Sequence, residues 1–246
     1  KHHMYQFIDP NDTFSIFKWL ECVSKTIHEV MSRGKTPIIL GGTPMYCRAL
    51  IDGISIIPDP TPNAIKETSL MIDEKGTEGA YQYLIENKII KEGDIKPTDT
   101  YRIERALKIF FTTGKSIKKA QEVKKYFLTP NIKVVKICIK PPRDVVYENC
   151  NQRFKQIIEE DGALDEVSAL MKKNINNNTP IMKAIGVREI QDYLLGNTSL
   201  EECIELASKH TRNYAKRQYT WFNNNFKDFH IVESPSLSKI LEIVRE

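Results

Sequence analysis

The chain lacks the features that mark several classes of protein. Its 246 residues include only 11 glycines and 12 prolines, which excludes a collagen-like or low-complexity chain. No apolar run approaches the ~20 residues that a membrane-spanning helix needs. The segment Lys1-His2-His3-Met4 is not followed by the apolar stretch of a secretory signal. With 41% hydrophobic and 28% charged residues, the composition is instead that of a globular protein with a sizeable core.

Cysteine is also scarce and shows no pairing pattern. The five cysteines form no CxxC pair, and no histidine near them supplies a zinc-like spacing. An odd number of thiols without such motifs favours reduced side chains in a cytoplasmic protein. We expect most of them to be buried as small apolar residues. They are Cys22, Cys47, Cys138, Cys150 and Cys203.

Two further features limit the possible partners. Lys and Arg total 36 against 32 Asp and Glu, and a net charge of +4 is weak evidence for nucleic acid because the position of the charge matters more than its sum. The sequence contains no GxxxxGK[ST] motif, so it lacks a phosphate-binding loop of that type. We expect a monomer that does not bind a membrane.

The N-terminal part is typical of one unit of an α/β sheet. Asp12 or Thr13 can cap a helix that stops at Gly34. The apolar run Ile38-Ile39-Leu40 predicts a short buried strand, and Gly41-Gly42-Thr43 follows it. Ligands of such sheets bind at the carboxyl ends of the strands, where the Thr43 hydroxyl would lie. Taken alone, the same turn also fits a plain connection between a strand and a helix.

The rest of the chain predicts an α/β core with a helical insertion. The prolines from Pro58 to Pro62 begin a stretch with little strand pattern, so we assign residues 55–129 to the insertion. The core then comprises residues 1–54 and 130–246, with further strands at 134–139 and 230–232. Helices are predicted in its C-terminal part at residues 145–158, 164–173, 187–195 and 199–224.

One helix of the insertion carries two arginines on the same side. Asp99 is a good N-cap for this helix, and Ile103 belongs to its buried stripe. Arg102 and Arg105 are three residues apart and could clamp phosphates or stack on bases. The alternative is a solvated face on which Glu104 pairs with a lysine four residues later, and the helix alone favours neither interpretation.

The strongest candidate for a functional surface is the basic helix that follows Glu205. Up to Asp228 it has five basic residues and no acidic one. Cations beside tyrosine and tryptophan suit a polyanion whose bases can stack. A basic helix that covers a core with its aromatic side chains is the alternative. The residues on its two adjoining stripes are Lys209, His210, Arg212, Tyr214, Lys216, Arg217 and Trp221.

Together these segments resemble the bacterial tRNA dimethylallyltransferase family along nearly the whole chain. The longest and most specific motif is Thr211-Arg212 with Ala215-Lys216-Arg217-Gln218 and Thr220-Trp221. The other motifs follow the order of the family: His2-His3 with Ile8-Asp9-Pro10, Gly34 to Thr43 with Tyr46 and Gly53, Pro97 to Leu107 with Thr113-Gly114-Lys115, and Ala184-Ile185-Gly186 with Glu189.

The resemblance implies an activity, a fold and partners. Members of the family transfer a dimethylallyl group from dimethylallyl diphosphate to N6 of adenosine 37, next to the anticodon of tRNA. The implied fold is α/β, a P-loop-NTPase-like parallel-sheet core with a mostly helical insertion domain that grips the tRNA anticodon stem-loop. Mg²⁺ would offset charge on the leaving group, held mainly by the diphosphate and by the P-loop of the family.

The resemblance also implies site residues. Thr43 would contact the target adenosine and Arg217 would hold the diphosphate, so both are candidate catalytic residues. No metal ligand is implied in this chain. The residues implied to bind tRNA are Thr43, Tyr101, Arg102, Ile103, Glu104, Arg105, Lys183, Gly186, Arg188, Lys216, Arg217, Gln218 and Trp221.

The sequence departs from the family pattern in several places. The P-loop and the aspartate proposed as general base would lie upstream of Lys1, so we expect this chain to be inactive on its own while it still binds RNA. Val187 stands where the family usually has Tyr, and Ile65 stands where we expect an Arg that reaches tRNA.

Two other functions fit the same residues. A prenyltransferase that acts on free adenine nucleotides would have little use for the insertion or the basic helix. A non-catalytic RNA-binding module would use both but would need no P-loop. Preference for AMP over an anticodon stem-loop would identify the first, and an open reading frame that starts near Met4 would favour the second.

Overall fold

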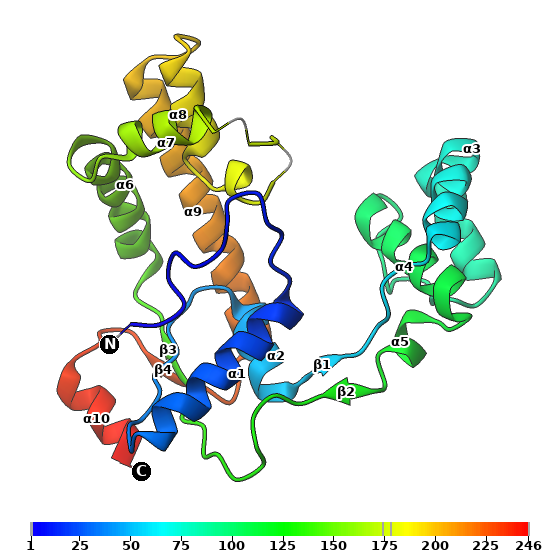
Figure 1. The fold of residues 1–246 in the computed structure, drawn as a ribbon, viewed down its shortest axis with the longest axis horizontal. Coiled ribbons are helices and arrows are strands. Elements are labelled where there is room, and N and C mark those ends of the chain that lie inside the picture. The colour runs from blue at the N-terminus through cyan, green and yellow to red at the C-terminus, as the bar shows by residue number, and fades with distance from the viewer. Residues whose placement is uncertain (1, 174, 178, 246) are drawn as a thin grey trace. The chain divides into compact units, whose positions relative to one another are not determined.

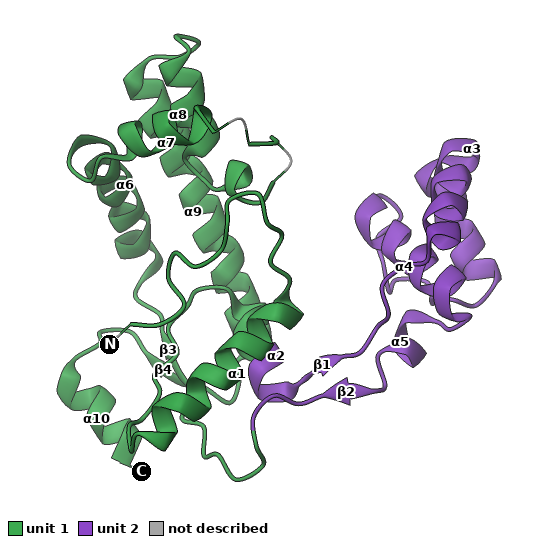
Figure 2. Cartoon of the chain, in the orientation of Figure 1, with its two compact units in different colours: residues 1–48, 129–246 green, residues 49–128 purple. Residues whose placement is uncertain are grey.

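The chain forms two compact units. The computed structural model describes residues 2–173, 175–177 and 179–245. Unit 1 comprises Lys1–Arg48 and Thr129–Glu246, and unit 2 comprises Ala49–Leu128 (Figure 2). Unit 2 therefore begins a few residues before the insertion boundary predicted at residue 55. None of the described helices is long and apolar enough to cross a membrane.

Unit 1 is mostly helical and contains a small parallel sheet (Figure 1). The coarse prediction of a mixed α/β fold is therefore confirmed. Its helices are α1 (Ile16–Ser32), the first half of α2 (Pro44–Asp52), α6 (Arg143–Glu159), α7 (Ala163–Met171), a 3₁₀ turn (Ile181–Lys183), α8 (Val187–Leu194), α9 (Leu200–Asn225) and α10 (Leu237–Arg245), and its strands are β3 (Ile137–Ile139) and β4 (His230–Val232).

Helix α1 starts later than predicted. Ser15 is its N-cap, and the Ser15 hydroxyl accepts a hydrogen bond from the Lys18 backbone N–H at 3.2 Å. The predicted caps Asp12 and Thr13 are therefore wrong. Ser15, directly before the first helical residue, supplies the acceptor for an otherwise unpaired N–H of the first turn. Gly34 follows the helix with φ 68°, as expected for a glycine that ends a helix.

The predicted buried strand at Ile38–Leu40 is wrong. The three residues are neither helix nor strand, and their side chains are 79%, 42% and 79% exposed. A strand requires a neighbour that pairs with its N–H and C=O groups, and no strand among the described residues pairs with this segment. The apolar character of the segment alone cannot supply that neighbour.

The two other predicted strands form the sheet of unit 1. The second, at 230–232, is confirmed with the same limits, and the first is shortened from 134–139 to 137–139. They pair in parallel with Cys138 opposite Ile231. Val232 is fully buried, and Cys138 is buried, so one face of this sheet contributes to the core.

Helix α9 of unit 1 has 26 residues. Ser199 caps it, and α6 and α8 pack against it (Figure 1). The predicted helix at 199–224 is confirmed, shifted by one residue. The buried core of this bundle consists of Phe154, Ile158, Ala163, Val167, Ile190, Cys203 and Ala207.

Unit 2 is a helical lobe with a short antiparallel ribbon. Its elements are the second half of α2, β1 (Ile54–Ser55), α3 (Pro62–Glu86), α4 (Thr100–Thr113), α5 (Ile117–Ala120) and β2 (Lys124–Lys125). Strands β1 and β2 pair with each other. Helices α3 and α4 enclose a core of buried apolar residues: Ala80, Tyr81, Leu84, Ile89, Ile90, Ile95, Ile103, Ala106 and Leu107.

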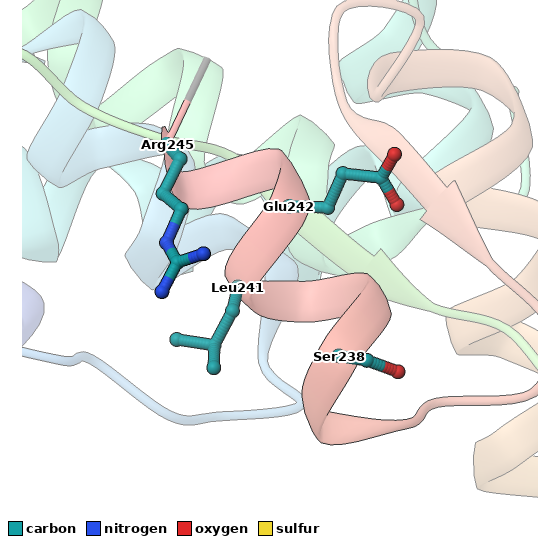
Figure 3. A pocket seen from close by; sticks show the side chains of 4 residues that line it. All are labelled: Ser238, Leu241, Glu242 and Arg245. Carbon is teal, nitrogen blue, oxygen red and sulfur yellow. The ribbon is translucent and has the colours of Figure 1, made fainter.

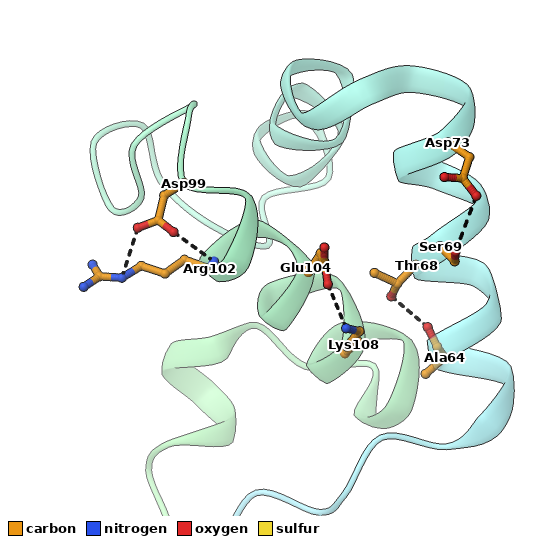
Figure 4. Close-up of polar contacts among 8 residues, drawn as sticks. All are labelled: Ala64, Thr68, Ser69, Asp73, Asp99, Arg102, Glu104 and Lys108. Carbon is orange, nitrogen blue, oxygen red and sulfur yellow. Dashed lines mark hydrogen bonds and ion pairs between the residues drawn. The ribbon is translucent and has the colours of Figure 1, made fainter. Parts of the chain in front are cut away.

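Helix α4 matches its sequence pattern closely. The Asp99 carboxylate accepts a hydrogen bond from the Arg102 backbone N–H at 3.1 Å, so the predicted N-cap is confirmed. Lys108 Nζ lies 2.9 Å from Glu104 Oε2, which confirms the predicted i, i+4 pair (Figure 4). On α3, the buried Thr68 hydroxyl donates to the Ala64 carbonyl at 2.7 Å, so it needs no partner outside the helix (Figure 4).

Candidate active site

Two side chains of α9 hold the Gly41-Gly42-Thr43 turn. The side-chain amide of Gln218 donates a hydrogen bond to the Gly42 carbonyl oxygen. Thr43 Oγ1 lies 3.4 Å from Tyr214 Oη. Tyr214 and Gln218 are four residues apart and therefore lie on one face of the helix. The structure thus joins two segments that are 176 residues apart in the sequence and that the motif analysis had noted separately.

Gly42 allows this contact because it has no side chain. A Cβ atom at residue 42 would lie 2.5 Å from Gln218 Nε2, which is closer than real Cβ contacts. A Cβ atom at Gly41 would have nothing within 4 Å. Close approach therefore explains the second glycine of the turn and not the first.

Arg217 lies in a groove beside the face of α9 that carries Tyr214 and Gln218. Its guanidinium carbon lies 5.5 Å from the centre of the Tyr214 ring, within the range of a cation–π contact. The groove is open, measures about 440 Å³, and is lined by two cations, several amides and no carboxylate. Such a lining suits a phosphate-bearing ligand. The lining residues are Asn213, Lys216, Arg217, Thr220, Trp221, Asn224 and Asn225.

The C-terminal end of α9 is fixed by packing and hydrogen bonds. Trp221 meets Phe226 edge to face at 5.1 Å, so this tryptophan, predicted to bind tRNA, also belongs to an aromatic cluster. Arg48 Nη1 lies 3.1 Å from Asn225 Oδ1 and ties α2 to the end of α9. The groove is therefore built on a rigid element.

A buried carboxylate lies between α8 and α9, and its partner is 21 residues away in the sequence. Glu189 is 7% exposed. Its Oε2 accepts a hydrogen bond from the Gly186 N–H at 2.9 Å, and its Oε1 lies 2.5 Å from His210 Nδ1. No local spacing links residues 189 and 210, so the sequence places His210 only on the stripe of α9 that carries Tyr214 and Trp221.

The predicted tRNA residues of unit 2 differ in their accessibility. Tyr101 is 73% exposed, and Arg102 and Arg105 are exposed as well. Glu104 is half-buried and pairs with a lysine. Ile103, which is also among the residues predicted to bind tRNA, is fully buried in the core of unit 2, so its side chain is not accessible to a ligand. The helical periodicity that puts Ile103 on the buried face of α4 puts Arg102 and Arg105 on its exposed face.

The predicted tRNA residues around α8 also divide into two kinds. Lys183 and Arg188 are exposed on either side of the N-terminus of the helix. Gly186 is buried, with φ 101°, and a Cβ atom there would lie 2.9 Å from Phe154 Cε2. Gly186 thus serves backbone geometry and packing, whereas the two cations are available to a ligand.

A second hollow lies along α10. Its walls are Ser238, Leu241, Glu242 and Arg245, which all belong to this one helix (Figure 3). Helix α10 contains no buried residue. A hollow formed by the side chains of a single exposed helix offers no convergent polar groups to a ligand.

Four of the five thiols are poor candidates for nucleophilic chemistry. Burial raises the pKa of the Cys47, Cys138, Cys150 and Cys203 thiols, so the reactive thiolate is disfavoured at neutral pH. All five cysteines are free, but only Cys138 and Cys203 are buried. The prediction that most of them are buried is therefore wrong.

The described residues also offer no metal site of their own. They contain no group of three or more His, Cys, Asp or Glu side chains that could hold an ion. The Mg²⁺ that the resemblance implies has no ligand assigned among these residues, and no chemical step below involves a metal.

Comparison with known proteins identifies the class to which this fold and site belong. Residues 1–225 match the family model described as IPP transferase. The chain therefore belongs to the IPP transferase family. It is 34% identical over 243 residues to the tRNA dimethylallyltransferase of Rickettsia felis, covering 99% of this chain and 78% of that protein. It is 35% identical over 242 residues to the tRNA dimethylallyltransferase of Wolbachia pipientis wMel, covering 98% of this chain and 80% of that protein.

Solved structures agree with this assignment. The full-length tRNA isopentenylpyrophosphate transferase of Bacillus halodurans matches with a TM-score of 0.64 and 29% identity, covering 99% of this chain and 76% of that one. A eukaryotic dimethylallyltransferase acting on tRNA matches with a TM-score of 0.70, covering 94% of this chain and 59% of that one. At 21% identity, this second likeness supports the fold alone.

Proposed function

We propose that the protein transfers a dimethylallyl group from dimethylallyl diphosphate to N6 of adenosine 37, next to the anticodon of a tRNA. The observation that carries the proposal is the contact between the Gly42-Thr43 turn and α9, in which Tyr214 touches Thr43 through its hydroxyl and Arg217 through its ring. The names of the curated relatives support the same activity.

The reaction is a substitution at the first carbon of the dimethylallyl group. The adenine N6 forms a bond to this carbon, the bond from the carbon to the diphosphate oxygen breaks, and N6 loses a proton to a base. Thr43 contacts the adenosine with a hydroxyl that can both donate and accept hydrogen bonds. Arg217 and Lys216 stabilise the charge that develops on the departing diphosphate. No described residue is assigned the role of the base.

Four other exposed cations bind the tRNA backbone in this proposal. Lys183 and Arg188 of unit 1 contact phosphates, and unit 2 grips the anticodon stem through Arg102 and Arg105. Tyr101 offers a flat exposed face for a base. A P-loop-like fold of the core and Mg²⁺ bound to the diphosphate belong to the same proposal, supported by the family assignment.

The proposal is tested by assaying the full-length protein with dimethylallyl diphosphate and an anticodon stem-loop. Arg217→Ala should lower turnover about 100-fold or more, because one charged donor on a leaving group is worth that much. Lys227→Ala, which removes an exposed cation just beyond α9, is the matched control and should remain active.

Two results would contradict the proposal. A stem-loop that stays unmodified after incubation with the wild-type protein would contradict the proposed activity. Full activity of Arg217→Ala would contradict the role assigned to Arg217. Preferential modification of AMP would instead identify a prenyltransferase of free nucleotides.

A further inference from the structure

A single tyrosine contacts both residues to which the proposed function assigns chemistry. Tyr214 Oη lies 3.4 Å from Thr43 Oγ1, and the Tyr214 ring lies 5.5 Å from the guanidinium carbon of Arg217. We infer that Tyr214 is a positioning residue, which orients Thr43 toward the adenosine through its hydroxyl and Arg217 toward the diphosphate through its ring. The inference rests on the proposed function and deepens it.

The hydroxyl side of the argument concerns an otherwise unsupported side chain. Thr43 is exposed and lies just before α2, outside any helix or strand. Either hydroxyl can donate in this pair. When the Tyr214 phenol donates, Thr43 keeps its own hydrogen and one lone pair for the nucleobase. A distance of 3.4 Å is long for two hydroxyls, and hydrogen bonds of catalytic groups commonly shorten when substrate is bound.

The ring side of the argument concerns a flexible cation. Arg217 is exposed at the edge of the groove, and a free arginine would sample many rotamers there. A guanidinium over an aromatic face loses part of this freedom before the ligand arrives. Since Tyr214 and Arg217 are three residues apart on α9, the helix itself sets the contact.

Another tyrosine of the same helix provides a matched control. The Tyr219 hydroxyl donates to the Pro141 carbonyl oxygen, which fastens α9 to the segment after β3. The contacts to Thr43 and Arg217 are made by Tyr214 and not by Tyr219, so Tyr219→Phe removes a hydroxyl of the same helix without removing either contact.

The experiment measures kcat and KM for both substrates in the full-length protein. Tyr214→Phe keeps the ring and should lower kcat/KM for the stem-loop about 3- to 10-fold, with KM for dimethylallyl diphosphate unchanged. Tyr214→Leu removes the ring as well and should also raise KM for dimethylallyl diphosphate about 2- to 5-fold. Tyr219→Phe should change the unfolding temperature and neither kinetic parameter.

A double substitution separates positioning from a general loss of structure. If the two hydroxyls act as a unit, Thr43→Val in the Tyr214→Phe background should cost no more activity than Thr43→Val alone. Independent, additive losses would overturn the inference, and so would wild-type kinetics of Tyr214→Phe, even if Tyr214→Leu fails to fold. An inactive wild-type protein would overturn the proposed function and this inference together, whereas the other two results leave the proposed function standing.

Discussion

Glu189 Oε1 and His210 Nδ1 lie 2.5 Å apart, in a contact that joins the start of α8 to the middle of α9. The same carboxylate accepts the Gly186 N–H through its other oxygen. A carboxylate with 7% exposure is stable in the interior only while such partners remain. The pair therefore fixes the start of α8, which carries Arg188, against the helix that carries Arg217.

Replacing this carboxylate should destabilise the protein. Glu189→Leu leaves the Gly186 N–H without an acceptor and should lower the free energy of unfolding by about 1–3 kcal/mol. Glu189→Gln should cost less, because its amide can accept from Gly186 and donate to the other tautomer of His210. Asp192→Asn removes a charge from the exposed face of α8 and is the control. Chemical denaturation measures all three, and equal effects would show that only the charge matters.

Gly186 should tolerate substitution less well than another glycine with positive φ. Gly186→Ala and Gly196→Ala both strain the backbone, by about 1–2 kcal/mol each. Only at Gly186 does the new Cβ meet a buried ring, that of Phe154 at 2.9 Å, and overpacking there should add about 1–3 kcal/mol. Gly196 has nothing within 4 Å. Thermal unfolding of the two variants should differ, and similar unfolding temperatures would argue against the contact.

Gly42→Ala should impair activity more than stability. The added Cβ would displace the end of the flexible Gln218 side chain, which can move without unfolding the chain. Once Gln218 is replaced by Ala, the same change at Gly42 should have little further effect, because the clash and the hydrogen bond are both gone. Turnover of the two single variants and the double variant forms the cycle. Strictly additive losses of activity would contradict the coupling of this turn to α9.

The start of α9 should become less stable in acid. The backbone N–H of Ser199, and then its hydroxyl, hold the pKa of Glu202 below its usual value. A carboxyl whose pKa is lowered by folding stabilises the folded state above its ordinary pKa, and this contribution is lost as the pH falls through the folded-state pKa. Glu202→Gln should therefore destabilise at neutral pH and approach the wild type below a pH of about 4. Glu201→Gln, on the same first turn, controls for the helix dipole, and a penalty independent of pH would contradict the assignment.

Two cations of α9 should affect RNA binding differently. Lys216 is exposed at the groove, whereas Arg212 is half-buried and donates a hydrogen bond to Asn151 of α6. Lys216→Ala should lower the log–log salt slope of stem-loop binding by about 1. Arg212→Ala should lower the unfolding temperature and change the slope less. Titrations at several salt concentrations measure both slopes, and a larger effect of Arg212 would place it in the RNA interface.

Local chemistry determined which elements could be predicted. Asp99 caps α4 by accepting the backbone N–H of Arg102, three residues later, so this cap could be predicted from nearby residues. The strand at 230–232 also has the limits that its short local pattern predicts. The 38–40 segment has the same apolar character, but a strand depends on a partner that no local pattern reveals. At α1, Ser15 lay closer to the apolar stripe than the two caps that were preferred.

The candidate site was predictable only in parts. The Gly-Gly-Thr turn and the basic helix could each be noted from composition and spacing. Their contact through Gln218 could not, because it joins residues 176 positions apart and depends on the path of the whole chain between them. Ile103 shows the converse case, since a motif match assigns it to the tRNA-binding residues while its helical position assigns its side chain to the core, where the structure places it.

Helix α9 is a single rod from Cys203 in the bundle core to Arg217 in the groove, a span of about 21 Å at 1.5 Å per residue. The destabilising effect of a cavity at the core end would extend along the whole helix, because helix formation is cooperative. Damage to the bundle would lower the fraction of molecules in which the groove is folded. Some variants would therefore be inactive although all their site residues are unchanged. Conversely, a phosphate-bearing ligand that occupies the groove would keep the distant bundle folded to a higher temperature.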